Sequence, residues 1–399
     1  MKESSSEADT RVLRVADSFK GQRHAWVFAC DPGGADASLP AIQRLRASSE
    51  FDFHIVTRGR AAQIFSANLS TVDVTPKGGA SQFVAERNSP SIAVVTVPQR
   101  MSTEVELTST HPELPIVLIE DYYRSSFQYL ELAREGRIEA PAAICAMDQM
   151  AEALISDTYP HFGDLVEVTG QPAFDALHGE EAVAERVKQR LGTDMRPLVT
   201  FMSSFEGPTF VEGFVAAAAD ALRETAFVFL QHPRDGTSPE EYNQIFHKQG
   251  VFPLEVPSDV TNDHIGAASD LIIGRRSTTL LRAIHRRKPT IHLQDPTESD
   301  PLPPVISGAS ASASVQRSGA LIQDLLVPNS SILRKLHEAM ELHYPLNSGA
   351  AERVTNVVQR LARPTNSRGR KPRVQQCRAP HQGLQSPMPS SRRSPRGAL

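Results

Sequence analysis

The sequence predicts an α/β protein made of two successive doubly wound units, each built around a parallel sheet. Short apolar runs alternate with amphipathic segments along most of the chain, a pattern typical of parallel strands joined by crossover helices. The alternation breaks at Gly170-Gln171-Pro172 and then starts again. A chain of 399 residues is also longer than one hydrophobic core usually organises.

The first unit is expected over residues 24–172, after a polar, disordered lead-in at residues 1–23. Short apolar runs predict its strands at residues 24–30, 51–57, 91–97, 116–120, 142–146 and 165–169. A glycine loop at residues 31–38 should lead into a helix at 39–48, and helices are also expected at residues 126–134 and 147–156.

The second unit is expected over residues 173–345 and begins with a charged amphipathic helix at 175–191. Its strands are predicted at residues 197–202, 226–231, 270–274 and 290–293, and its helices at 208–223, 239–249 and 330–342. Residues 321–326 fit either a strand or a short helix. A last helix is predicted at residues 350–362.

Composition excludes several classes of protein. No run approaches the roughly 20 apolar residues of a membrane-spanning helix, and the N-terminus lacks the apolar core of a secretory signal. Cys30, Cys145 and Cys377 are far apart and odd in number, which favours a reducing cytoplasm over a disulfide framework. No cysteine–histidine cluster has zinc spacing, and neither a metal ion nor another cofactor is expected.

Residues 364–399 are predicted to form a disordered basic tail, because they contain eight Lys or Arg, no acid and few apolar residues. The rest of the chain then has 34 basic against 46 acidic residues, a net charge of −12. This acidic body is a poor candidate for nucleic-acid binding, so no nucleic-acid partner is expected. The tail is either a functionless solvated extension or a basic arm that contacts anionic lipid or nucleic acid. An arm on lipid would place this cytoplasmic protein peripherally at a membrane.

Residues 270–293 read as strand, glycine turn, hydroxyl-capped helix and second strand. The helix start is marked by Ser277, Thr278 and Thr279, with Arg275 and Arg276 just before it. A helix start offers unpaired N–H groups and partial positive charge, and parallel sheets bind ligands outside the carboxyl ends of their strands. The segment therefore predicts a phosphate site, the alternative being an ordinary N-cap.

Three further groups of residues are candidates at strand ends. Gly33 and Gly34 follow the first strand and would let a substrate approach the backbone, or simply form a tight turn. Glu120 and Asp121 end another strand; one of them could act as a general base, and the alternative is an N-cap with a solvated charge. His232 ends an apolar strand before Pro233, where it could bond a phosphate or remain an ordinary surface histidine.

The segment V-E-V-T-G-Q-P-A-F-D-A-L at residues 166–177 resembles the linker of GT-B-fold sugar enzymes, which include glycosyltransferases and the UDP-N-acetylglucosamine 2-epimerase group. His232-Pro233 and the Ser277 helix start are similar to donor-phosphate motifs of CDP-glycerol glycerophosphotransferase and polysialyltransferase types. Glu120-Asp121 falls where the latter have an acidic motif. The resemblance covers about residues 24–362 and implies two facing Rossmann-like domains, acceptor first and nucleotide second, with a helix at residues 346–363 returning to the first.

One position departs from the pattern of these relatives. Many have a glutamate in the helix after the serine–threonine start, and here that position is Arg282. A ribose-binding carboxylate would then be missing, and Arg282 would bind phosphate or an acidic sugar, or the donor site would be degenerate.

The resemblance implies a glycosyltransferase-like enzyme that moves a sugar or polyol phosphate from a nucleotide donor to a glycan or lipid-linked acceptor, in surface polysaccharide or glycoconjugate synthesis. In that mechanism Glu120 or Asp121 would deprotonate the acceptor, and His232 with the Ser277–Thr279 helix start would stabilise the departing phosphate. The alternatives are a nucleotide-sugar 2-epimerase or hydrolase and a non-catalytic binding relative.

Overall fold

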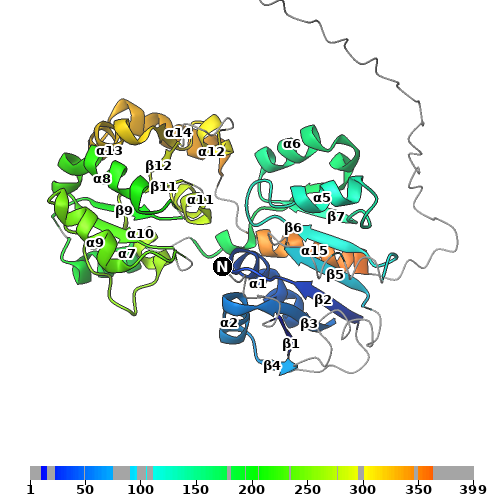
Figure 1. Cartoon of the computed structure of the whole chain (residues 1–399). Coiled ribbons are helices and arrows are strands. Elements are labelled where there is room, and N and C mark those ends of the chain that lie inside the picture. The colour runs from blue at the N-terminus through cyan, green and yellow to red at the C-terminus, as the bar shows by residue number, and fades with distance from the viewer. Residues whose placement is uncertain are drawn as a thin grey trace, which may run out of the picture. The chain divides into compact units, whose positions relative to one another are not determined.

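The computed structural model describes most of the chain up to Ala362 (Figure 1). The described residues are 10–15, 23–48, 50–74, 90–96, 105, 111–177, 181–193, 195–204, 206–232, 235–275, 277–294, 301–345 and 349–362. Arg276, Pro233 and the basic tail that the sequence predicts lie outside them. No helix among these residues is both long enough and apolar enough to cross a membrane.

The first sheet has eight strands in the order β4-β1-β3-β2-β5-β6-β7-β8. Its strands are β1 (Thr10–Val15), β2 (Arg23–Phe28), β3 (Phe51–Arg58), β4 (Thr71–Val74), β5 (Ile92–Thr96), β6 (Ile116–Ile119), β7 (Ala143–Ala146) and β8 (Val166–Val168). Strand β2 pairs in parallel with β3 on one side and β5 on the other, and the pairing stays parallel out to β8. The strand order therefore reverses direction at β2, where ligand crevices form in open α/β sheets.

Strand β1 corrects the expectation that residues 1–23 form only a disordered lead-in. Residues 10–15 run antiparallel between β3 and β4. Val12 packs against one face of the sheet, and Leu13 and Val15 against the other. Because two of its six residues are arginines, this segment does not look apolar by composition.

The second sheet has five parallel strands in the order β10-β9-β11-β12-β13. They are β9 (Leu198–Met202), β10 (Ala226–Leu230), β11 (Leu271–Gly274), β12 (Thr290–Leu293) and β13 (Ala311–Ala313). Strand β9 lies between β10, the next strand along the chain, and β11, so the carboxyl ends of β9 and β11 flank the second point of reversal. The two parallel-sheet units confirm the predicted fold class.

Helices cover both faces of each sheet. On the first sheet, α1 (Pro32–Ala47), α2 (Gly59–Asn68) and α15 (Ala350–Ala362) pack on one face, and α5 (Phe127–Arg134) and α6 (Gln149–Thr158) on the other (Figure 1). On the second sheet, α8 (Pro208–Arg223), α9 (Pro239–Lys248), α13 (Ser318–Leu326) and α14 (Ser331–His343) share one core, and α7 (Glu181–Leu191) and α10 (Asn262–Ala268) share another. Helices α11 (Thr278–His285) and α12 (Pro303–Ile306) complete this unit.

Two helix starts differ from the sequence prediction. Helix α1 begins at Pro32, so residues 31–38 are not a glycine loop: the Asp31 side chain accepts a hydrogen bond from Gly34 N, and Pro32 supplies the first helical turn. Helix α7 begins at Glu181 rather than at residue 175. The Asp175 carboxylate instead accepts the N–H groups of Ala350 and Ala351 at 2.9 and 2.8 Å and so caps α15.

Helix α15 joins the end of the described chain to the first sheet. Val354, Val357 and Val358 belong to the core beneath that sheet. Arg353 Nε donates to the Thr169 carbonyl at 2.8 Å, directly before the linker glycine. Gly170 has a φ of +81°, and a Cβ there would lie 3.0 Å from Ala350 Cβ, so glycine fits both the backbone and the space.

Candidate functional site

The carboxyl edge of the first sheet brings three acids close together. Asp31 follows β2 and caps α1, whereas Glu120 and Asp121 follow β6. Gln171 Nε2, from the linker, donates to the carbonyls of Glu120 and Asp121 at 3.1 and 3.3 Å and so ties the linker to this loop. The predicted acidic pair thus lies at the sheet's point of reversal.

Gly33 and Gly34 lie in the first turn of α1 and let it approach the neighbouring strand ends. A Cβ on Gly33 would be 2.8 Å from Asp121 Oδ2, and one on Gly34 would be 2.3 Å from Thr96 Oγ1. Neither glycine has a positive φ, so close approach, and not turn geometry, is what requires them. The groups that approach these glycines are side chains of the protein, and the close approach places the Asp121 carboxylate beside the start of α1.

Glu120 is enclosed by the protein. Its residue surface is 1% exposed, and Ser126 Oγ donates to its Oε1 at 2.8 Å. Burial raises the pKa of Glu120 to about 8, with the hydrogen bond from Ser126 opposing the shift. The carboxyl group is therefore largely neutral at pH 7 and out of reach of a bound substrate.

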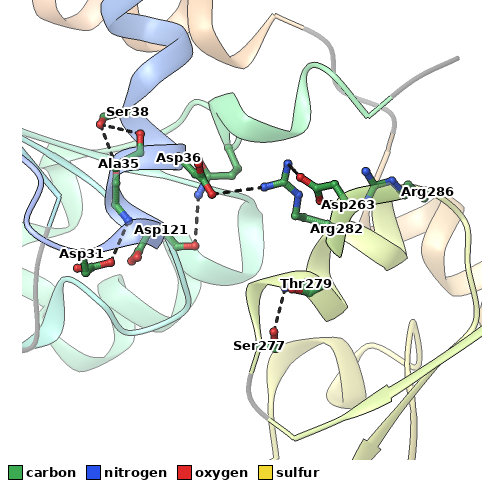
Figure 2. Close-up of polar contacts among 12 residues, drawn as sticks. Asp31, Ala35, Asp36, Ser38, Asp121, Asp263, Ser277, Thr279, Arg282 and Arg286 are labelled. Carbon is green, nitrogen blue, oxygen red and sulfur yellow. Dashed lines mark hydrogen bonds and ion pairs between the residues drawn. The ribbon is translucent and has the colours of Figure 1, made fainter. Parts of the chain in front are cut away.

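Asp121 has the properties of a general base. It is only partly buried, and its side chain lies beside Gly33 and Asp31 (Figure 2). Burial raises its pKa to about 7, and the negative charge of Asp31 adds to the shift. A base whose pKa is near the working pH combines a useful ionised fraction with a strong pull on a proton. Of the two predicted acids, the geometry favours Asp121.

The corresponding edge of the second sheet has hydroxyl groups and cations. Ser277 caps α11, accepting a hydrogen bond from Thr279 N at 3.2 Å, and Thr278 and Thr279 form the partly exposed first turn. A Cβ on Gly274 would lie 2.8 Å from the Met202 carbonyl, so β9 and β11 approach closely just before this turn. Ser277 thus does make the N-cap that was the alternative for this motif. Because Leu280 N also bonds the Ser277 carbonyl, at 3.0 Å, this turn would meet a ligand mainly with the Thr278 and Thr279 hydroxyl groups and the partial positive charge of the helix start.

Two more predicted residues border this edge. Arg275 is partly buried, with its guanidinium 5.1 Å from the ring centroid of Phe210 in α8. His232 is partly buried and follows β10. Because β9 separates β10 from β11, two strand spacings, or about 10 Å, lie between the ends of the strands that lead to His232 and Ser277. A nucleotide diphosphate could span that interval.

Arg282 lies one turn into α11 and is surrounded by acids. Its Nη2 is 3.0 Å from Asp263 Oδ2 on α10, and its Nη1 is 4.0 Å from Asp36 Oδ2 on α1 (Figure 2). Arg286 also pairs with Asp263, at 3.5 Å. The Arg282 cation is thus matched by two carboxylates, and one of them comes from the helix whose first turn faces Asp121.

Four residues of this region were not predicted as site residues: Asp31, Asp36, Gln171 and Asp263. Asp31 could have been found, because Asp followed by Pro before an apolar run is a helix-start signal. The other three act through contacts between segments far apart in the chain. The structure brings Gly33, Gly34 and Asp121 together, and it places Ser277, Thr278, Thr279 and Arg282 on one helix.

No protein-family model and no curated protein sequence matches the chain. Solved structures do match it. UDP-GlcNAc 2-epimerase from Neisseria meningitidis, bound to UDP-GlcNAc, aligns with a TM-score of 0.62 and 16% identity over 85% of this chain and 100% of that one. Anabaena HepE in complex with UDP-glucose gives 0.56 and 14% over 85% and 98%. The glycosyltransferase SnogD from Streptomyces nogalater gives 0.52 and 17% over 86% and 100%. The chain therefore has the GT-B fold that its motifs resemble.

Proposed function

We propose that this chain is a glycosyltransferase-like enzyme that moves a sugar or polyol phosphate from a nucleotide donor to a glycan-type acceptor. The main support is the Asp121 carboxylate, set beside Asp31 at the start of α1 with a pKa near 7. A hydroxyl group placed against Asp121 could lose its proton as it attacks the donor sugar. Proton transfer of this kind contributes roughly 10²- to 10⁴-fold to a rate.

The donor would bind at the second sheet. The first turn of α11 offers hydroxyl groups and the partial positive charge of a helix start, and His232 and Arg275 lie at the same carboxyl edge. Preorganised donors and cations of this type stabilise the negative charge that develops on a leaving phosphate. In this proposal no metal ion takes part in the transfer. Arg282 would act through its ion pairs, holding α11 beside Asp36 of α1.

A second candidate is a nucleotide-sugar 2-epimerase or hydrolase. Its support is the fold match to the Neisseria epimerase and the same base, since Asp121 could remove a proton from a sugar carbon. The two candidates differ in what they need: a transferase consumes donor only with an acceptor present, whereas an epimerase or hydrolase needs none. A non-catalytic relative would bind nucleotide without turnover.

The test uses the full chain with UDP-GlcNAc, UDP-glucose and CDP-glycerol, each with and without a mixture of glycan acceptors. We expect nucleotide release that requires an acceptor and is lost in Asp121→Asn. Epimerised or hydrolysed sugar without an acceptor would establish the second candidate. Binding of nucleotide with no turnover of any donor would contradict both enzymatic proposals.

A further inference from the structure

A second polar cluster lies at the opposite end of the first sheet. His24 belongs to β2, and Asp52 and His54 belong to β3. The parallel register pairs His24 with Asp52 and Trp26 with His54. Because side chains alternate along a strand, these four residues share one face of the sheet. Counted along β2, the cluster is roughly 20 Å from Asp31 at the other strand end, so it is separate from the site described above.

The spacing of the three side chains suits a metal ion. One ligand atom from each of His24, Asp52 and His54 lies within 4.8 Å of the others. His24 Nδ1 is 3.5 Å from Asp52 Oδ2. Two ligands about 2.1 Å from a tetrahedral Zn²⁺ are themselves about 3.4 Å apart. The pair therefore already has the separation that a shared ion requires.

The burial of Asp52 is a second reason to expect a cation at this cluster. The Asp52 side chain is only 7% exposed, and its Oδ1 has no hydrogen-bond partner among the described residues. A buried carboxylate oxygen without a partner is costly, and a bound cation would satisfy it. The imidazole of His54 is stacked on Trp26, with 4.8 Å between ring centroids, which fixes the orientation of the ring.

Arg14 contacts the same carboxylate without blocking it. Its Nη2 donates to Asp52 Oδ2 at 3.3 Å from a side chain that is 39% exposed. An outer partner of this kind orients a ligating carboxylate, as in many metal sites. Its positive charge also opposes cation binding, so the site should be weaker than a fully acidic or thiolate one.

We propose that His24, Asp52 and His54 form a binding site for a transition-metal cation of the Zn²⁺ class. Imidazole and carboxylate ligands suit such ions, and three protein ligands leave one tetrahedral position for water. His24, whose side chain is 30% exposed, gives access from solvent. Bound there, the ion would cross-link β2 and β3 at their amino ends and stabilise the fold.

The test is calorimetric titration of ZnCl₂ into tag-free full-length protein, with thermal unfolding recorded alongside. We expect saturable binding of one ion per chain and a higher melting temperature with Zn²⁺. His24→Ala and Asp52→Asn should each weaken binding by at least about tenfold, since even the loss of an outer-shell partner weakens metal affinity by about 10- to 100-fold.

The matched control is His161→Ala, which removes an exposed histidine from the segment directly before β8, four strand positions from β2 in the sheet, and should bind Zn²⁺ like wild type. His24 is partly exposed, so its variant keeps the test valid if Asp52→Asn fails to fold. Absence of saturable binding by wild type, or equal affinity in wild type and His24→Ala, would overturn the proposal and leave the cluster as an ion pair between Asp52, Arg14 and His24.

Discussion

In both sheets a strand ends against the start of a helix. The groups around that helix start are carboxylates in the first sheet, and hydroxyl groups with a cation in the second. At the first sheet, the start of α1 faces carboxylates: Asp31 caps it and Asp121 lies against Gly33. At the second, the start of α11 is capped by Ser277 and has hydroxyl groups and Arg275 nearby. A helix start favours negative charge in both places. In the first unit the protein supplies that charge itself, and in the second we propose that a ligand supplies it.

This difference suggests a division of labour between proton transfer and phosphate binding. Acids with raised pKa values cluster at the first edge, whereas the groups at the second edge suit an anion. The ion pair between Arg282 and Asp36 connects α11, at the edge of the second sheet, to α1, at the edge of the first.

Replacing Asp121 should produce the largest effect. Asp121→Asn removes the proposed base while preserving its shape, and we expect turnover to fall by about 10²- to 10⁴-fold. Glu120→Gln is the matched control, because Glu120 is buried and largely neutral at pH 7, so its amide should retain turnover within a few fold. Steady-state rates of the two variants test this prediction. A greater loss of turnover in Glu120→Gln than in Asp121→Asn would identify Glu120 as the base.

His232→Ala should have the next largest effect and should act on binding. A hydrogen bond to a charged group is worth roughly 1.5–3 kcal/mol, so nucleotide affinity should fall about 10- to 150-fold. Thr278→Ala should weaken it less, because the rest of the helix start remains. Calorimetric titration with UDP and CDP measures both. Unchanged affinity in His232→Ala would place the nucleotide elsewhere.

Arg282→Gln tests the ion pairs that connect α11 to α1 and to α10. The Arg282 side chain is 17% exposed and pairs with Asp263 and Asp36, so its loss should lower the free energy of unfolding by about 1–3 kcal/mol, between the values for exposed and buried pairs. Lys248→Gln, which breaks an exposed pair with Glu212, should change it little. Chemical denaturation gives the comparison. Normal stability with weakened nucleotide binding would instead make Arg282 a phosphate ligand.

The smallest effect should be a shift in pH dependence. If Asp121 must be ionised, the rate should rise with pH through about 7. Burial is the main cause of the raised pKa, and the Asp31 charge is the next. Asp31→Asn removes that charge but keeps an N-cap residue, so the pKa of Asp121 should fall and the rising limb should move to lower pH. A limb that stays in place would mean that another group titrates.

Local pattern was enough to predict most of the fold. Apolar runs located the parallel strands of both sheets except β13, whose Ala-Ser-Ala sequence has no apolar run, and Gly170-Gln171-Pro172 lies where one sheet gives way to the other. Strand β1 was missed because its pairing with β3 is antiparallel and its arginines mask a short apolar core. The glycine loop was wrong because Gly33 and Gly34 are required by the neighbouring Asp121 and Thr96 side chains and not by backbone conformation.

The candidate site was less predictable than the fold. Because parallel sheets bind ligands outside the carboxyl ends of their strands, the predicted strand ends indicated Asp121, His232 and Ser277. Nothing in the local sequence distinguished Asp121 from Glu120, because they differ in burial and in the hydrogen bond that Ser126 donates to Glu120. The His24, Asp52 and His54 cluster has no zinc spacing along the chain, since its members come from two strands and meet only through their register. Contacts of this kind require the tertiary structure.

The most direct test of the division of labour is the affinity of Asp121→Asn for UDP, measured by calorimetric titration at pH 7.5. If the first edge only transfers protons, the dissociation constant should match that of wild type within about twofold, even though turnover is lost. A loss of affinity of tenfold or more, equivalent to about 1.4 kcal/mol, would show that Asp121 helps to hold the nucleotide and would contradict the account.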